Sequence, residues 1–169
     1  MKINERRQKI LEMLDKNIIY KGAELANKLG VSRQVIVQDV AVLRAAGYNI
    51  LATPQGYLLP GPEKRCQRTF ACQHDLPGLQ RELEIITDFG GKVVDVVVEH
   101  PFYGEIRGYL MITSRFEVQR FIAELKKNDA LPLYVLTGRG VHLHTVEAES
   151  ESRLDSIQQA LLAAGILLE

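Results

Sequence analysis

The sequence has few cysteines and no long apolar runs, the features that would assign it to a disulfide-rich or a membrane class. Only two of its 169 residues are cysteine, so no disulfide framework is available, and we expect Cys66 and Cys72 to be reduced thiols. No apolar run approaches the ~18 residues of a membrane helix, and the N-terminus lacks the apolar core of a signal peptide. With ordinary hydrophobic and charged contents of 46% and 25%, the composition predicts a globular cytoplasmic protein.

Net charge is also absent, but its distribution along the chain is uneven. Residues 1–60 carry nine Lys/Arg against five Asp/Glu, whereas residues 61–169 carry twelve against sixteen. A basic part joined to an acidic remainder is typical of a DNA-binding module fused to a second domain. The Pro/Gly-rich stretch 60–64 is the expected linker. The sequence therefore predicts two domains, residues 1–60 and 65–169.

The N-terminal part has the pattern of two short helices separated by a sharp turn. Gly30 supplies the backbone freedom that the end of the first helix needs. Ser32 is suited to accept hydrogen bonds from the free amides that begin the second helix. Ile36, Val40 and Leu43 then recur at intervals of four and three residues, which predicts the buried stripe of that helix.

A predicted hairpin follows, because residues 48–52 and 56–59 alternate in polarity around a Pro-Gly turn. The stretch LAxxLxVSRQxIxxDVxxLRxxGYxIxAxxxGYxL resembles the winged helix-turn-helix of the biotin-repressor and deoxyribose-repressor type. The resemblance implies that the second helix enters the major groove of DNA. A small helical bundle with a solvated polar face is the alternative. The side chains expected to contact DNA are Ser32, Arg33, Gln34, Val37, Gln38 and Gln55.

Beyond residue 65 the pattern alternates between strands and helices. Strands are expected at 65–73, 92–99, 105–112, 133–136 and 141–147, and helices at 75–89, 114–127 and 151–164. This order predicts an α+β fold close to the split βαβ arrangement of ferredoxin-like proteins, with an antiparallel sheet and helices on one face. Leu76 and Phe116 are expected to face that sheet.

All four histidines lie in the second domain. His142 and His144 are two residues apart in a predicted strand, so both imidazoles project from one face and offer two ligands to a transition metal. An HxH pair alone is weak, because such pairs are often incidental. His74 stands where a strand passes into a helix. Glu82 lies two turns into that helix, about 40° beyond its apolar arc, and is placed to lean toward the same site. Without the histidines, Glu82 would be interpreted as an exposed glutamate on a helix.

These residues fall in segments that resemble a known domain. CQHDLPGLQRELEIITDFGGKVVDVVVEHPFYGEIRG, TSRFEVQRFI and LTGRGVHLHTVEAES are similar to the 3H domain, which is named for its histidines. The whole chain resembles the niacin-responsive repressors of NAD biosynthesis genes. The resemblance implies nicotinic acid as effector and a divalent metal (nickel, zinc or iron) held by His74, Glu82, His142 and His144. We also expect a homodimer on operator DNA, because one winged head contacts few base pairs.

A second group of side chains surrounds the motif VEHPFYGEIRG. His100 precedes a proline at the end of a predicted buried strand, which suits the rim of a ligand pocket. Tyr103 is suited to stack on a flat ring, and Arg107 to pair with a carboxylate. Purely structural roles for Tyr103 and Arg107 are equally compatible with the sequence.

Three functions are compatible with the sequence. The first is a regulator in which nicotinate changes the relation of two subunits on DNA. The second is a small metalloenzyme with a regulatory DNA-binding head, which the sequence disfavours because GRG at 138–140 is too short to cradle a phosphate and precedes a strand. The third is a DNA-binding dimer with a structural metal and another effector. We favour the first and expect no enzymatic activity.

Overall fold

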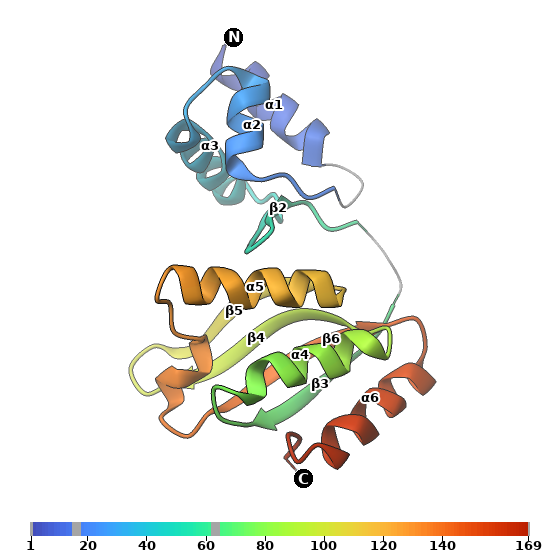
Figure 1. Ribbon diagram of the computed structural model, residues 1–169. Coiled ribbons are helices and arrows are strands. Elements are labelled where there is room, and N and C mark those ends of the chain that lie inside the picture. Colours follow the sequence, from blue (N-terminus) through green and yellow to red (C-terminus); the bar gives the residue numbers. More distant parts are fainter. Residues whose placement is uncertain (1, 15–17, 62–64, 169) are drawn as a thin grey trace. The chain divides into compact units, whose positions relative to one another are not determined.

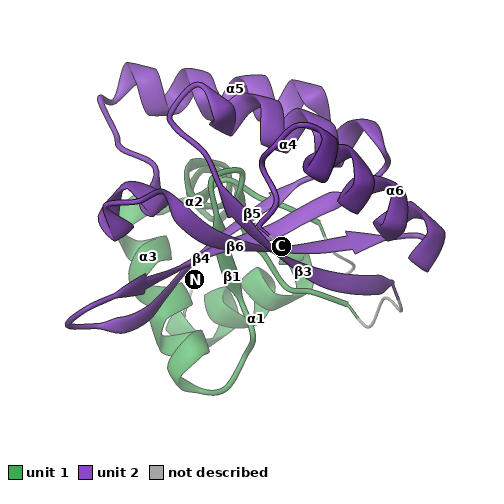
Figure 2. Ribbon diagram, turned by 90° about the horizontal axis from the view of Figure 1, so that it is seen from below, with its two compact units in different colours: residues 1–63 green, residues 64–169 purple. Residues whose placement is uncertain are grey.

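The computed structural model describes residues 2–14, 18–61 and 65–168. The chain divides into two compact units, residues 1–63 and 64–169 (Figures 1 and 2). Part of the expected linker, residues 62–64, lies outside the described residues. None of the described helices is long and apolar enough to cross a membrane.

The first unit contains three helices followed by a two-stranded wing (Figure 1). Its wing strands are antiparallel, and an isolated bridge between Tyr20 and Tyr57 ties the segment before the second helix to the wing. The elements are α1 (Ile3–Leu14), α2 (Gly22–Leu29), α3 (Arg33–Ala45), β1 (Leu51–Thr53) and β2 (Gly56–Leu58). The first strand is shorter than the expected 48–52, and Tyr48 lies outside it, 44% exposed.

The local signals that predict α3 are confirmed. Gly30 ends α2 with φ +67°, in the left-handed region that glycine adopts without strain. The hydroxyl of Ser32 accepts a hydrogen bond from the amide of Val35 at 3.4 Å. The expected stripe of Ile36, Val40 and Leu43 is buried in the core of this unit.

A buried carboxylate fastens α3 to α1. Asp39, 2% exposed, accepts hydrogen bonds from Nε of Arg6 at 2.5 Å and from Nε of Arg7 at 2.9 Å. Burial alone would raise the pKa of Asp39, but the two guanidinium groups outweigh it and lower that pKa. The carboxylate is therefore charged at neutral pH and holds the two helices together.

The second unit is a four-stranded sheet in the order β3-β6-β4-β5, and each neighbouring pair is antiparallel. Strand β6 lies between β3 and β4, so β3-α4-β4 is a split βαβ unit. The expected α+β class and antiparallel sheet are confirmed. The elements are β3 (Cys66–Gln73), α4 (Gly78–Asp88), β4 (Lys92–His100), β5 (Gly104–Ile112), α5 (Arg115–Lys127), η2 (Leu133–Thr137), β6 (Val141–Ala148) and α6 (Glu151–Ala163).

Helices α4, α5 and α6 cover one face of this sheet, as expected (Figure 2). Helix α4 contacts both α5 and α6 and shares one hydrophobic core with the strands. Its inner residues include Leu83 and Ile86, both fully buried, and α6 contributes Leu154, Ile157 and Leu161. The opposite face of the sheet carries partly exposed side chains such as Val141 and Leu143. The sheet thus has a covered face and an open face.

Three local predictions were wrong. Residues 133–136 form part of the 3-10 helix η2 rather than a strand, because Pro132 precedes it and Gly138, at φ +71°, ends it after Thr137. Leu76 is 55% exposed, because α4 begins only at Gly78. Phe116 is 70% exposed, because Val118 is the residue near the start of α5 that faces the core.

Candidate functional site

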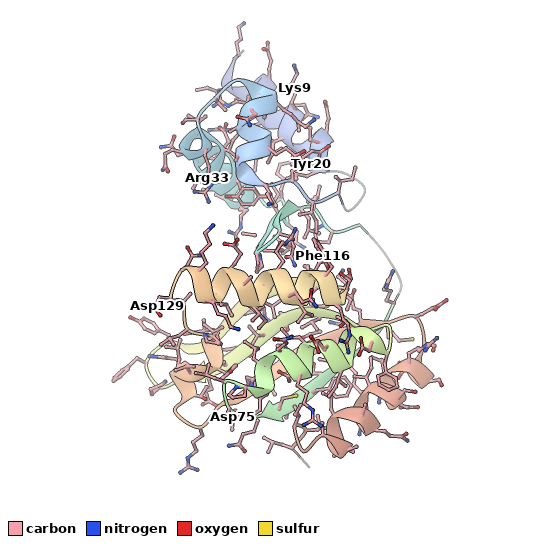
Figure 3. All side chains as sticks on the ribbon, viewed as in Figure 1. Lys9, Tyr20, Arg33, Asp75, Phe116 and Asp129 are labelled. Carbon is pink, nitrogen blue, oxygen red and sulfur yellow. The ribbon has the colours of Figure 1, made fainter. Side chains whose placement is uncertain are left out.

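Four of the predicted site residues lie together beneath α4 on the covered face of the sheet. His142 and His144 project from β6, His74 directly follows β3, and Glu82 extends from the middle of α4. Their side chains are almost entirely covered, with exposed fractions of 0%, 1%, 5% and 0%, respectively. Asp75, which follows His74, begins the turn that leads into α4 (Figure 3).

The ligand atoms of this group converge on one carboxylate oxygen. Oε2 of Glu82 lies 2.7 Å from Nε2 of His74, 3.2 Å from Nε2 of His142 and 3.4 Å from Nε2 of His144. The atoms of His74, Glu82 and His142 all lie within 4.8 Å of one another. Oε1 of Glu82 and Nε2 of His144 are buried without a hydrogen-bond partner. Buried polar atoms are rarely left unsatisfied, so these two indicate room for a further partner.

The far nitrogen of each imidazole is fixed by the main chain. Nδ1 of His74 lies 2.7 Å from the carbonyl oxygen of Asp75, and Nδ1 of His142 lies 2.8 Å from that of Gly140. Nδ1 of His144 lies 2.5 Å from the carbonyl oxygen of Asp95. A carbonyl only accepts, so every Nδ1 carries a proton, and a neutral ring then directs the Nε2 lone pair inward. Metal-ligating histidines have this outer hydrogen bond, and the donor set suits a divalent transition metal.

In the absence of a cation, protons balance the buried carboxylate. Burial opposes ionisation of Glu82, but the charge of His144 and the hydrogen bonds from His142 and His74 hold the pKa of Glu82 well below its usual value. Burial also opposes protonation of His74 and His144, yet Glu82 outweighs it and raises the pKa of both. A metal would take the place of these protons, so metal binding should release them.

Three residues that sequence reasoning missed shape the cluster. The ring of Tyr134 in η2 stacks on that of His142, with centroids 5.0 Å apart and an angle of 24° between the planes. Burial raises the pKa of Tyr134 to about 12, so the phenol stays neutral. A Cβ on Gly78 would lie 2.6 Å from Cβ of His74, and one on Gly140 would lie 2.5 Å from the carbonyl oxygen of His74. Both glycines therefore allow the main chain to approach His74 closely. In the sequence, the one signal of this role was their position beside candidate ligands.

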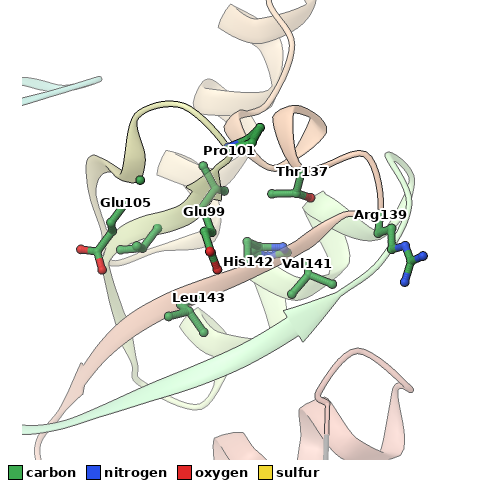
Figure 4. A pocket seen from close by; sticks show the side chains of 11 residues that line it. Glu99, Pro101, Glu105, Thr137, Arg139, Val141, His142 and Leu143 are labelled. Atoms are coloured by element: carbon green, nitrogen blue, oxygen red, sulfur yellow. The ribbon is translucent and has the colours of Figure 1, made fainter.

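A cavity of about 630 Å³ lies beside His142 at the open face of the sheet (Figure 4). It forms where two strands diverge, because the last pair between β4 and β6 is Val97 with Leu143. Val97, Val141 and Leu143 provide apolar lining, and Glu99, Thr137 and Arg139 provide polar lining. In Figure 4 the guanidinium group of Arg139 points away from the cavity. Apolar walls with a few polar groups are typical of small-molecule sites.

His100, Tyr103 and Arg107 do not line this cavity. Nδ1 of His100 accepts hydrogen bonds from the amides of Phe102 and Tyr103, at 3.2 and 3.4 Å, and so holds the turn after β4. Tyr103 is 80% exposed. Arg107 is paired with Asp95 and, at 3.0 Å, with Glu105, so two carboxylates already match its charge. The structure brings His100 and Tyr103 together, with ring centroids 4.9 Å apart, but does not bring Arg107 to them.

The residues expected at DNA lie at the start and on the outer side of α3 and in the wing turn. Arg33 stands at the beginning of α3 (Figure 3). Ser32, Arg33, Gln34 and Gln38 are exposed and Val37 is half-buried. Gln55 is 6% exposed, so its side chain is the least accessible of the six. A helix-turn-helix with an outward-facing second helix, joined to a unit with a buried histidine cluster, defines a DNA-binding protein with a second, histidine-bearing domain.

Comparison with known proteins supports this class. Residues 6–58 match a helix-turn-helix domain family, and residues 67–169 match the 3H domain family. The probable transcription repressor NiaR of Thermotoga maritima is 47% identical over 148 residues, which cover 88% of this chain and 84% of that protein. The transcription repressor NadR of Bacillus subtilis is 40% identical over 173 residues, which cover 100% of this chain and 96% of that protein.

The chain belongs to the 3H-domain family, which confirms the resemblance recognised from its histidine-bearing segments. Its relatives are named as repressors, and the chain is accordingly a DNA-binding transcription regulator rather than an enzyme.

Proposed function

We propose that this chain is a nicotinate-responsive repressor of genes for NAD biosynthesis or niacin uptake. It acts in the cytoplasm as a homodimer on double-stranded operator DNA. The observation that carries the proposal is the buried cluster of three imidazoles and one carboxylate in a chain that also has a DNA-binding unit. The named repressors to which the chain is similar support the same reading.

The divalent metal is held by His74, Glu82, His142 and His144. Nickel, zinc and iron all accept three imidazoles and a carboxylate, so the donor set admits each of them. A bound metal would supply positive charge in place of the protons now shared with Glu82. The residues of the chain then act by holding each imidazole in one tautomer, through the carbonyl groups that accept from Nδ1.

Nicotinate occupies the cavity beside His142. Its flat ring fits the apolar wall of Val97, Val141 and Leu143. Glu99 disfavours an anion on its side, so the carboxylate of the ligand faces Arg139, whose guanidinium group points away from the cavity in Figure 4 and turns toward the ligand on binding. His100 and Tyr103 do not line the cavity but hold the turn whose Pro101 and Gly104 do, and so shape its rim indirectly. Arg107 acts on the ligand site through Asp95 and Glu105, because these two carboxylates already match its charge.

At the other end of the chain, α3 enters the major groove and the wing lies along the adjacent backbone. The side chains proposed to contact DNA are Ser32, Arg33, Gln34, Val37, Gln38 and Gln55. A dimer reads two half-sites about one helical turn apart, so a small rotation between subunits alters DNA affinity. A coupling of about 1–3 kcal/mol between the nicotinate and DNA sites is sufficient for regulation.

The first test is calorimetric titration of nicotinate, with nicotinamide as the control ligand, into protein of measured metal content. We expect binding of nicotinate only, and its loss in the His142→Ala/His144→Ala double variant. Arg139→Ala should weaken binding about 10–100-fold, since a charge-assisted hydrogen bond contributes about 1.5–3 kcal/mol. The matched control is Arg153→Ala, on the exposed side of α6. DNA binding is then measured by fluorescence anisotropy on duplexes selected from a random pool, with and without nicotinate.

One observation favours a second candidate, a DNA-binding dimer with a structural metal and another effector. All four ligands are buried, and closed four-ligand sites are typical of structural rather than catalytic metals. Metal bound at one equivalent, with no heat from nicotinate and no change in DNA affinity, would select this second function. Heat from nicotinate that depends on the metal selects the first.

A further inference from the structure

Asp95 of β4 links the two faces of the sheet. Its carbonyl oxygen accepts from Nδ1 of His144, at 2.5 Å, on the covered face. Its side chain extends to the open face, where Oδ2 accepts from Nη1 of Arg107. The register of β4 and β5 establishes that this is the open face. Arg107 stands opposite Val97, and Val97 lines the cavity on that face. Asp95 is only 1% exposed, so its carboxylate is a buried charge that these partners must satisfy.

The main chain around Asp95 departs from a regular ladder. Val93 pairs with Val146 and Val97 pairs with Leu143, so four steps along β4 match three steps along β6. One extra residue in β4 makes this a β-bulge, which redirects main-chain groups away from ladder pairing. Within the bulge, Oδ1 of Asp95 accepts from the amide of Thr145 on β6 at 3.0 Å. The side chain of Asp95 thus accepts the hydrogen bond that the amide of Thr145 would otherwise donate to a main-chain carbonyl. The carbonyl of Asp95 is therefore free to accept from His144.

Only a carboxylate satisfies both partners of this side chain. The amide of Thr145 and the guanidinium group of Arg107 are both donors, and each takes a different oxygen of Asp95. Asparagine has the same shape but replaces one acceptor with an NH₂ donor, which would face a donor in either orientation. Asp95→Asn therefore disrupts the bulge without removing volume.

We propose that Asp95 is a positioning residue of the metal centre. From the open face, its carboxylate holds the bulge of β4 in the shape that presents its own carbonyl to Nδ1 of His144. That bond keeps Nε2 of His144 directed at the carboxylate of Glu82. The inference rests on the metal centre proposed above, and it extends that centre across the sheet to Arg107.

The test measures metal affinity and ligand geometry in the full chain. Ni²⁺ affinity is determined by competition with a chelator, and Co²⁺ substitution reports coordination through its visible absorption spectrum. We expect Asp95→Asn to bind Ni²⁺ about 10–100-fold more weakly, the range found when outer partners of metal-ligating histidines are removed, and to alter the Co²⁺ spectrum. The matched control is Glu147→Gln, which removes a carboxylate of β6 that pairs with Lys92 at 3.3 Å, and which should change neither quantity.

Arg107→Gln serves as a second variant in case Asp95→Asn fails to fold. Arg107 is 39% exposed, so its loss leaves no cavity, and we expect a smaller loss of Ni²⁺ affinity with the same spectral change. A folded Asp95→Asn variant with unchanged affinity and spectrum overturns the proposal. So does an unchanged Arg107→Gln variant if Asp95→Asn does not fold.

A metal-independent measurement separates this inference from the proposed metal centre. In metal-free protein, NMR of ¹⁵N-labelled histidine should show the Nδ1 proton of His144 protected from solvent exchange. Asp95→Asn should abolish that protection. If the parent chain binds no metal, the metal centre is wrong, and the NMR result still decides whether Asp95 positions His144. Retained protection in Asp95→Asn overturns the positioning role.

Discussion

Glu82→Gln tests the buried cluster most directly, because Glu82 is its only anionic group. The substitution keeps the shape of the side chain and replaces a charged, metal-ligating carboxylate with a neutral amide. Free metal buffered at 100 times the dissociation constant stabilises the folded chain by about 2.7 kcal/mol. Loss of an outer partner alone costs about 10–100-fold in affinity, and Glu82 is in direct contact with the three imidazoles.

With a 100-fold loss, the same free metal stabilises the variant by only about 0.4 kcal/mol. The difference of about 2.3 kcal/mol converts to a melting temperature through an unfolding entropy of about 2.1 cal/mol/K per residue. For the unit formed by residues 64–169, the metal-induced rise in Tm should therefore be about 10 °C smaller in the variant.

The assay is differential scanning calorimetry of the parent chain and the variant, each with buffered Ni²⁺ and with chelator. Glu84→Gln is the matched control, since Glu84 lies on the same helix, is 19% exposed and is 3.6 Å from Arg115. It should keep the full metal-induced rise. The reasoning is refuted if Glu82→Gln keeps that rise, or if Glu84→Gln loses it to the same extent.

Three further predictions concern other parts of the chain. The folded-state pKa of Asp39 is lowered, so its stabilisation is complete above the unfolded pKa of about 3.9 and is lost as the pH falls toward the folded value. Asp39→Asn should cost about 1–3 kcal/mol at pH 7, measured by urea unfolding, and less at pH 2, which lies below the unfolded pKa. Gly140→Ala should lower Ni²⁺ affinity, because φ +74° and the carbonyl of His74 leave no room for Cβ. Iodoacetamide should modify Cys66 before Cys72, which is fully buried, as mass spectrometry can show.

Each of these predictions has a result that contradicts it. Equal costs of Asp39→Asn at pH 7 and pH 2 would mean that the carboxylate does not stabilise α1 against α3. Parent-like Ni²⁺ affinity in Gly140→Ala would show that the turn before β6 can move without disturbing His74. Simultaneous labelling of both cysteines in native buffer would show that β3 opens readily.

The cluster could be anticipated because its residues obey regular periodicities. Two-residue spacing on a strand places His142 and His144 on one face, and 100° steps on a helix place Glu82 near the sheet. The structure has all three side chains in those positions. His74 stands at the junction between a strand and a helix, and its place in the ligand set was implied by the resemblance to the 3H domain.

The parts that escaped prediction depend on departures from regular geometry. A bulge has no sequence signal in KVVDVVVE, where Asp95 reads only as a polar residue in an apolar strand. Arg107 is separated from Asp95 by a turn, and their pairing depends on a β4–β5 register that is shifted by an extra residue of β5 between Tyr109 and Ile112. Tyr134 was assigned to a strand that does not form, so its stacking on His142 was invisible. Tertiary contacts, rather than local propensity, determine these positions.

One strand carries both halves of the proposed sensor. On β6, His142 and His144 face the buried cluster, whereas Val141 and Leu143 line the cavity on the opposite face. If nicotinate occupies that cavity, any shift it causes in β6 displaces the metal ligands as well. Such coupling is reciprocal, so the factor by which metal raises nicotinate affinity must equal the factor by which nicotinate raises metal affinity. Unequal factors at equilibrium would mean that nicotinate binds at more than one site.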